Sequence, residues 1–111
     1  MAIYSNLTID QGSNFLAYVD VTDSSGNALD LNGYTVAGQI RKTYSSLTAV
    51  SFSASVSNAL GGTISLGLSD TVTNAMKPGR YVYDVEILNS NGTRTRVLEG
   101  QVEVTPGVTQ V

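Results

Sequence analysis

The sequence predicts an all-β protein, a sandwich of about seven antiparallel strands in a single domain over residues 1–111. Two observations support this prediction. Short runs in which apolar and polar residues alternate recur along the chain, and a period of two is typical of half-buried strands. Clusters of Gly, Asn, Asp and Ser separate these runs, as turns between strands require. A chain of 111 residues is long enough to bury one core without disulfides.

The clearest strand follows the turn signal Pro78-Gly79. Its alternate positions are aromatic or β-branched and should share one buried face: Tyr81, Tyr83, Val85 and Ile87. Tyr81 comes two residues after the turn glycine, at the start of a central strand, which is the position of the tyrosine corner in immunoglobulin-like sandwiches. In that motif the ring is buried and the hydroxyl bonds to the backbone just upstream. The sequence therefore predicts an immunoglobulin-like β-sandwich.

Six further strands are expected, with the first at a sheet edge and each separated from the next by a turn, a pattern break or a short helix. The fourth and fifth should form a hairpin across Gly61-Gly62, and Asn89-Ser-Asn-Gly92 should form the turn before the last strand, because Asn-Gly tolerates positive φ. The expected strands cover 2–9, 15–21, 34–44, 50–56, 64–68 and 93–104.

One short helical turn is expected near residues 69–76. Ser69 or Asp70 could cap its N-terminus, and Pro78 would prevent it from continuing. The apolar residues of this segment are expected to face inward: Val72, Ala75 and Met76.

Composition excludes several classes of function. The chain has no Cys and no His, so it lacks thiolate metal ligands, disulfides and the commonest general base. A Ser nucleophile would have no His to activate it. The formal net charge is −3, which offers no basic footprint for nucleic acid. No apolar run approaches the ~20 residues that span a bilayer, and the N-terminus has no signal-peptide pattern. We expect no enzyme, cofactor or metal, and a soluble protein made in the cytoplasm.

Three carboxylates should face one another across the last hairpin: Asp84, Glu86 and Glu99. Paired carboxylates can serve as acid and base in glycoside cleavage. Arg94 and Arg96 lie on the neighbouring strand, however, and should pair with the carboxylates across the ladder. We therefore favour solvated ion pairs over a carboxylate hydrolase.

Other polar patterns have ordinary explanations. Asp20, Asp23, Asn27 and Asp30 gather around one loop. Calcium uses such oxygen ligands, but the spacing fits no calcium loop and is typical of turns. The two Asn-x-Thr sequons, at Asn6 and Asn91, are interpreted as incidental because no export signal precedes them.

Charge is unevenly distributed, which leaves a docking role open. Before Arg41 the only charged residues are acidic, and every basic residue lies between Arg41 and Arg96. The segments 1–9 and 105–111 are expected to be interaction arms, since an exposed edge strand can accept a strand from a partner. Deleting 105–111 should then weaken assembly and leave the fold intact.

The order of several short motifs resembles that of small phage virion proteins with an immunoglobulin-like fold. The resemblance covers nearly the whole chain and includes the N-terminal domain of phage baseplate upper proteins and stand-alone structural proteins of cyanophages. The motifs are Leu31-Asn-Gly-Tyr34, Gln39-Ile-Arg-Lys42, Tyr44-Ser-Ser, Lys77-Pro-Gly-Arg-Tyr-Val-Tyr-Asp84, Thr95-Arg-Val-Leu-Glu-Gly100 and Val102-x-Val-Thr-Pro106.

This resemblance implies a non-enzymatic virion protein that binds in many copies to an assembled particle, as a capsid decoration protein or a tail or baseplate component. Its expected location is the virion, after synthesis in the host cytoplasm. The expected partners are the major capsid protein or tail and baseplate proteins, and a homo-oligomer is a further possibility. No nucleic acid or membrane partner is expected. The alternative is an adhesin-like module that holds a glycan or host protein through exposed tyrosines such as Tyr18, Tyr34 or Tyr44.

Overall fold

The computed structural model describes residues 3–108. Over this part of the chain it contains nine strands and one short helix. In chain order the elements are β1 (Ile3–Tyr4), β2 (Leu7–Asp10), β3 (Phe15–Asp20), β4 (Thr35–Arg41), β5 (Val50–Ser51), β6 (Ser53–Asn58), β7 (Thr63–Leu68), α1 (Asp70–Ala75), β8 (Gly79–Leu88) and β9 (Arg94–Thr105). The helix α1 in this range is neither long nor apolar enough to cross a membrane.

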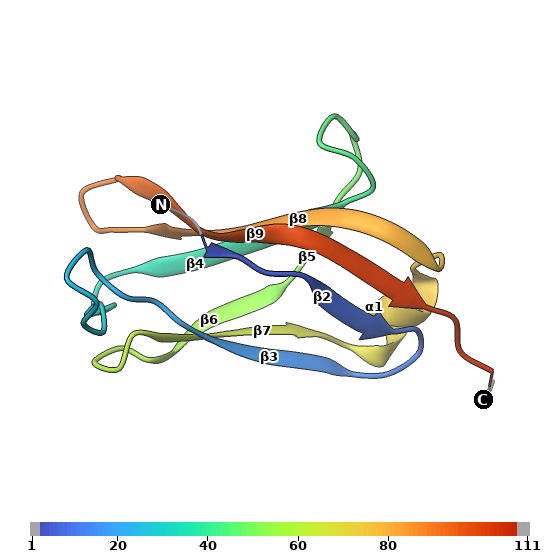
Figure 1. Ribbon diagram of the computed structural model, residues 1–111, viewed down its shortest axis with the longest axis horizontal. Coiled ribbons are helices and arrows are strands. Elements are labelled where there is room, and N and C mark those ends of the chain that lie inside the picture. Colours follow the sequence, from blue (N-terminus) through green and yellow to red (C-terminus); the bar gives the residue numbers. More distant parts are fainter. Residues whose placement is uncertain (1–2, 109–111) are drawn as a thin grey trace.

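The strands form two layers, which Figure 1 shows one above the other. The larger sheet has the order β1-β9-β8-β4-β5, with β2 also paired to β9, and the smaller sheet has the order β3-β7-β6. This arrangement confirms the predicted all-β sandwich. One detail differs from the prediction: β1 and β2 run parallel to β9, so the larger sheet is mixed rather than wholly antiparallel.

The core lies between the layers and is filled from alternate positions of both sheets. On β7 the inward residues Ile64 and Leu66 are fully buried, and on β8 Val85 is equally inaccessible. The predicted buried face of β8 is confirmed, with Tyr83, Val85 and Ile87 buried and Tyr81 packed against them. Alternation therefore identified the inner face of the central strands correctly.

Tyr81 forms the predicted tyrosine corner. Its hydroxyl donates to the Lys77 carbonyl, 2.6 Å away and four residues upstream. The Lys42 ammonium lies 4.7 Å from the centroid of the Tyr81 ring, within range of a cation–π contact. The hydroxyl bond fixes the entry of the chain into β8 and supports the immunoglobulin-like form of the sandwich.

The strand predicted over 50–56 is two strands in different sheets. Val50–Ser51 pairs with β4 in the larger sheet, whereas Ser53–Asn58 pairs with β7 in the smaller one. The change occurs at Phe52, whose backbone N–H donates to the Gly38 carbonyl and whose side chain is buried. A Cβ on Gly38 would lie 2.9 Å from the Phe52 ring, so this glycine makes room for the crossing. Alternation alone cannot show the change, because both strands keep the same inward positions.

The predicted helical turn is present, but two residues expected to face the core are exposed to solvent. Ser69 caps α1 by accepting from the Val72 N–H at 3.3 Å, and Met76 is buried. Val72 and Ala75 are exposed, and Thr73 is buried in their place. The Thr73 hydroxyl donates to the Ser13 carbonyl at 2.8 Å and accepts from the Gly12 N–H at 3.1 Å. These bonds satisfy the buried hydroxyl, so a polar residue is stable there.

The third predicted strand also ends earlier than expected. The pattern suggested 34–44, but β4 ends at Arg41 and residues 42–49 form a loop. A turn closes within this loop, where the Ser46 N–H donates to the Thr43 carbonyl.

The N-terminal strand is attached to the larger sheet by contacts around Ser5. The buried Tyr83 hydroxyl donates to the Ser5 carbonyl at 2.6 Å, and the Ser5 N–H donates to the Glu99 carbonyl at 2.8 Å. A Cβ on Gly100 would lie only 2.0 Å from the Ser5 carbonyl oxygen. The close approach of the two backbones therefore requires glycine at this position. Asn6 continues the attachment by accepting from the Gln101 N–H.

The two segments proposed as interaction arms are partly built into the fold. Residues 3–9 supply β1 and most of β2, and Ile9 is fully buried. Thr105 closes β9 against the first turn, with its hydroxyl on the Asp10 carboxylate and its carbonyl on the Gln11 N–H. The Gly107 N–H also donates to the Gln11 side chain. Residues 1–2 and 109–111 lie outside the described part. Because Thr105 and Gly107 bond to the first turn, a deletion meant to spare the fold should retain both residues.

Replacing Gly100 with Ala should destabilise the protein by about 3 kcal/mol, because the new methyl group displaces Ser5 and strains the β1–β9 attachment. Urea unfolding followed by circular dichroism measures the change. Gly67→Ala is the matched control, since its Cβ would meet nothing closer than 3.5 Å. Equal stability of the two variants would contradict the close approach.

Burial raises the pKa of Tyr83 from 10.0 to about 12. The folded protein therefore holds this proton more tightly than the unfolded chain, and the resulting stability is complete below pH 10 and lost as the pH rises through 12. Tyr83→Phe should lower the free energy of unfolding by about 1 to 2 kcal/mol at pH 8, because the Ser5 carbonyl loses its partner. The difference between wild type and variant should narrow from pH 10 to 12 in urea titrations. A constant difference would mean that the Tyr83 proton is not linked to folding.

Candidate interaction site

The carboxylates singled out in the sequence lie on the outer face of the larger sheet. Asp84 is directly opposite Glu99 in the β8–β9 ladder, and Arg96 reaches both. Its guanidinium lies 3.3 Å from the Asp84 carboxylate and 3.8 Å from that of Glu99. These three side chains are between 37% and 54% exposed. Such exposed ion pairs contribute little free energy to folding.

The bulge in β9 explains why Arg96 pairs and Arg94 does not. The register shifts between Val85 and Glu86, which places Arg96 opposite Glu86 and Arg94 opposite Leu88. No ion pair of Arg94 occurs among residues 3–108. The predicted pairing is therefore confirmed for Arg96 and wrong for Arg94.

The acidic side chains near the first long loop are engaged in local turns. The Asp23 carboxylate accepts from the Ser25 and Asn27 N–H groups at 2.9 and 3.1 Å. Asp30 accepts from Asn32, and Asp20 accepts from the Thr63 hydroxyl. No three His, Cys, Asp or Glu residues in the described range gather closely enough to hold a metal ion. The Asp23 and Asp30 carboxylates therefore order the loop between β3 and β4, whereas the Asp20 bond joins β3 to β7.

The three tyrosines proposed for sugar binding do not form one surface. Tyr34 packs against the core, whereas Tyr18 and Tyr44 are 63% and 84% exposed. Tyr18 lies on β3 in the smaller sheet, and Tyr44 lies in the loop that follows β4 in the larger sheet. Tyr44 lies beside a hollow on the outer face of the larger sheet.

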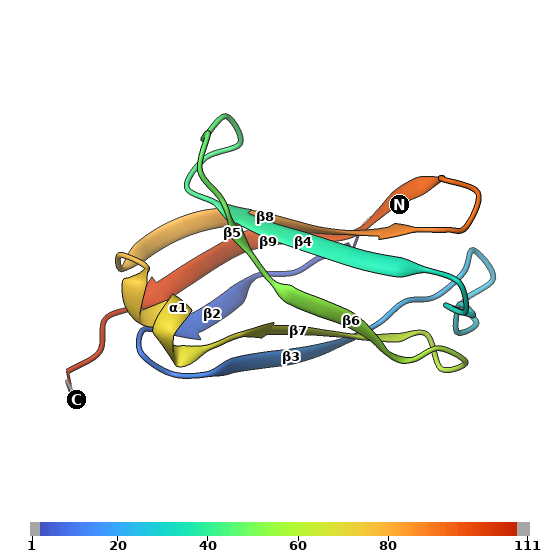
Figure 2. The ribbon, with the colours of Figure 1, turned by 180° about the vertical axis from the view of Figure 1, so that it is seen from behind.

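The 42–49 loop is the most prominent projection of the molecule. Figures 1 and 2 show it standing out from the larger sheet between β4 and β5. Tyr44 is 84% exposed and Leu47 is 99% exposed, so residues 3–108 leave both apolar side chains largely uncovered. The sequence did not reveal this loop, because Tyr44 continued the apparent strand.

The base of the loop is held in shape by hydrogen bonds. The Arg41 guanidinium donates to the Ser46 carbonyl and to the Gln39 side chain. The Thr43 N–H donates to the Ser46 hydroxyl at 3.0 Å. The loop is therefore ordered near its base while its two large apolar side chains stay uncovered.

A shallow hollow of ≈ 330 Å³ adjoins this loop on the outer face of the larger sheet. Val82 and Tyr83 adjoin it on β8, and Tyr44 is on the loop side. Charged or amide groups complete the lining: Gln39, Arg41, Asp84, Glu86 and Arg96. An aromatic residue beside a small apolar area with a polar rim is typical of a protein interface. We call the 42–49 loop and this hollow the loop site.

Comparison with known proteins finds no matching family model and no match among curated proteins. Among solved structures, an internalin-like protein of Listeria monocytogenes, lmo2027, is 19% identical, with a TM-score of 0.49. The match covers 94% of this chain and 28% of that protein. A structure from a study of multimeric cell-adhesive interactions of VGSC beta subunits is 12% identical, with a TM-score of 0.48 and 92% coverage of both chains. These likenesses concern the fold alone, and the virion resemblance stays a prediction.

Replacing Asp84 with Asn should change the free energy of unfolding by less than about 1 kcal/mol, because the Arg96 pair is solvated. The effect should shrink further in concentrated salt. Val85→Ala, at the next residue but on the buried face, should cost about 2 kcal/mol in the same urea titration. A cost for Asp84→Asn as large as that for Val85→Ala would show that the carboxylate has a structural role.

Proposed function

We propose that this chain is a non-enzymatic bacteriophage virion protein that attaches in many copies to an assembled particle through protein contacts. The observation that carries the proposal is the loop site, where an ordered loop presents Tyr44 and Leu47 to solvent beside a polar-rimmed hollow. The resemblance of the motif order to that of phage virion proteins supports the proposal that this particle is a virion. Exposed large apolar residues that project together favour a binding role over simple solvation.

The size of the loop site favours repeated attachment. Covering a Leu or Tyr side chain stabilises a complex by about 1.5–3 kcal/mol before the costs of association. Specific interfaces bury about 1,200–2,000 Å² in total, which is more than one short loop supplies. Neighbouring copies on a symmetric surface would add further contacts, and multivalency would raise the overall affinity. Capsid decoration and tail attachment both fit this requirement.

Glycan binding is the second candidate, and the lining of the hollow favours it. Tyr44 provides an aromatic ring, while Asp84, Glu86 and Arg96 provide groups that can bond to sugar hydroxyls. A glycan array probed with the purified chain tests this candidate. Saturable sugar binding that is lost in Tyr44→Ser would favour the adhesin-like module over the structural protein.

Particle attachment can be tested with particles of the phage that encodes the chain, prepared without this protein. Wild-type chain added back should bind in many copies, counted by quantitative mass spectrometry and located by electron cryomicroscopy. The double variant Tyr44→Ser/Leu47→Ser should bind about tenfold or more weakly, because both apolar contacts are lost.

Leu60→Ser is the matched control for this experiment. Leu60 is also exposed, at 74%, but lies in the turn between β6 and β7. Its substitution should leave attachment unchanged. If the loop variant binds like wild type, the loop site is not the contact, and if purified natural particles lack the chain, the virion role is wrong.

A further inference from the structure

The strand β3 has one edge without a partner. It is the terminal strand of the smaller sheet and, among residues 3–108, pairs only with β7. The Val21 N–H donates to the Gly62 carbonyl in continuation of this ladder. Because antiparallel ladders alternate, the backbone groups of Phe15, Ala17 and Val19 point toward β7. The N–H and C=O groups of Leu16, Tyr18 and Asp20 therefore face the free edge.

The free edge of β3 lacks the features that normally prevent strand addition. The other terminal strands are protected: β5 has two residues, β6 is interrupted by a register shift after Val56, and β1 and β2 are separated at residues 5–6. By contrast, β3 pairs with β7 over six residues without a shift. It contains no Pro and no Lys, and Leu16 and Tyr18 are 62% and 63% exposed. Long, regular and apolar edges of this kind readily pair with another strand.

The inner side of β3 is also incompletely covered. Phe15, Ala17 and Val19 point toward the core but are only partly buried. On the neighbouring β7, the inward residues Ile64 and Leu66 have no exposed surface. The difference arises because β7 has a strand on both sides and β3 has one. A further strand at the free edge would cover apolar surface on both faces of β3.

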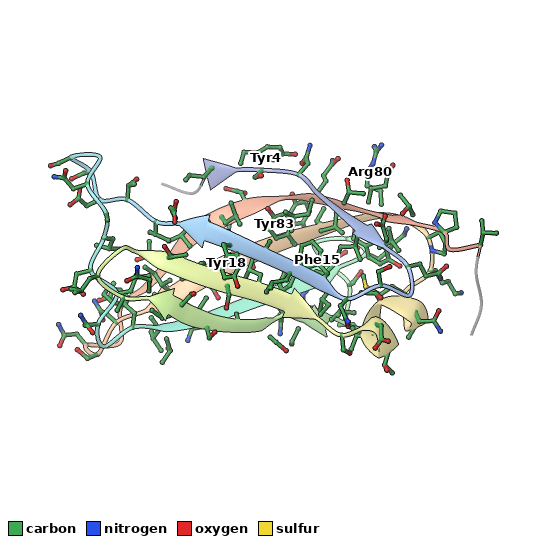
Figure 3. All side chains as sticks on the ribbon, turned by 90° about the horizontal axis from the view of Figure 1, so that it is seen from below. Tyr4, Phe15, Tyr18, Arg80 and Tyr83 are labelled. Carbon is green, nitrogen blue, oxygen red and sulfur yellow. The ribbon has the colours of Figure 1, made fainter. Side chains whose placement is uncertain are left out.

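The position of β2 favours a single extended segment over a second copy of the chain. Figures 1 and 3 show β2 in the other layer, along the same side of the sandwich as the free edge of β3. A second copy that paired its β3 with this β3 would place its own β2 next to the β2 of this chain. A single extended strand would bring no second layer with it.

The charged residues near the free edge of β3 favour one sign of charge on the segment that binds there. Asp10 is the last residue of β2, Asp20 is the last residue of β3, and Asp23 lies just beyond β3. No Lys or Arg occurs in β2, β3, β6 or β7, and Arg80, the basic residue that lines a hollow with Leu7 and Thr8 of β2, belongs to the larger sheet. Basic residues on the segment would therefore be attracted and acidic ones repelled.

We propose that the free edge of β3 binds an extended segment of a partner protein that has apolar residues at alternate positions and Lys or Arg at its ends. The segment adds a fourth strand to the smaller sheet and bonds to the backbones of Leu16, Tyr18 and Asp20. The inference rests on the proposed function only in taking the partner to be a protein, and it does not involve the loop site.

The test uses the full chain and the peptide acetyl-Lys-Lys-Val-Thr-Val-Thr-Val-Lys-Lys-amide in an NMR titration. The peptide should bind saturably, and hydrogen exchange at the amides of Leu16, Tyr18 and Asp20 should slow about tenfold or more. Leu16→Lys should weaken binding about tenfold or more, because it adds a charge at the apolar edge. Leu60→Lys makes the same charge change elsewhere and should bind like wild type.

Each other outcome would overturn the proposal. A peptide with Glu in place of every Lys that binds equally well would refute the charge preference. Protection at β6 or β5, or no binding at millimolar peptide, would refute the assignment to β3. Protection of the same amides without peptide, together with a dimer in analytical ultracentrifugation, would identify a second copy as the occupant. Because the particle experiment depends on the loop site, failure here leaves that result unaffected.

Discussion

The close contact of Ser5 with Gly100 and Tyr83 determines which sheet receives the N-terminal strand. The Tyr83 hydroxyl and the missing Cβ of Gly100 let the Ser5 backbone lie directly on β9. Residues 3–10 therefore extend the larger sheet. They would otherwise be available to the smaller sheet, which is left with three strands and an open β3. One buried contact thus sets both the composition of the larger sheet and the edge that the smaller sheet exposes.

The candidate surfaces are formed by what this packing leaves uncovered. Alternation buries one side of each central strand, so the outer faces carry ion pairs such as Arg96–Asp84 and small hydroxyl residues. Large apolar side chains reach solvent at several places, and two of these are the 42–49 loop and the edge of β3. They lie on different sheets, so one copy could contact two neighbours. That arrangement would suit a protein that joins subunits of an ordered particle.

Three errors in the sequence-based prediction have identifiable physical causes. The alternation around Phe52 is compatible with one strand or with two strands in different sheets, because the inward positions do not change. Apolar character suggested that Val72 faces inward, but the hydroxyl of Thr73 finds partners in the turn before β3 and takes the buried position. Tyr44 continued the pattern of β4 although the chain had already left the sheet. The first two outcomes depend on partners distant in the sequence, whereas the 42–49 loop is closed by local bonds such as that from the Ser46 N–H to the Thr43 carbonyl.

The sequence alone determined the all-β class, the inner faces of β7 and β8, the Tyr81 corner and the turn at Asn89–Gly92. These features depend on neighbouring residues, whose period, turn chemistry and backbone preferences act locally. Only the tertiary structure decided that the N-terminal strand runs parallel to β9, that the chain changes sheets at Phe52 and that the edge of β3 is open. Those features depend on which backbones can approach each other closely, as Gly38 and Gly100 allow, and contacts between distant residues leave no periodic signal in the sequence.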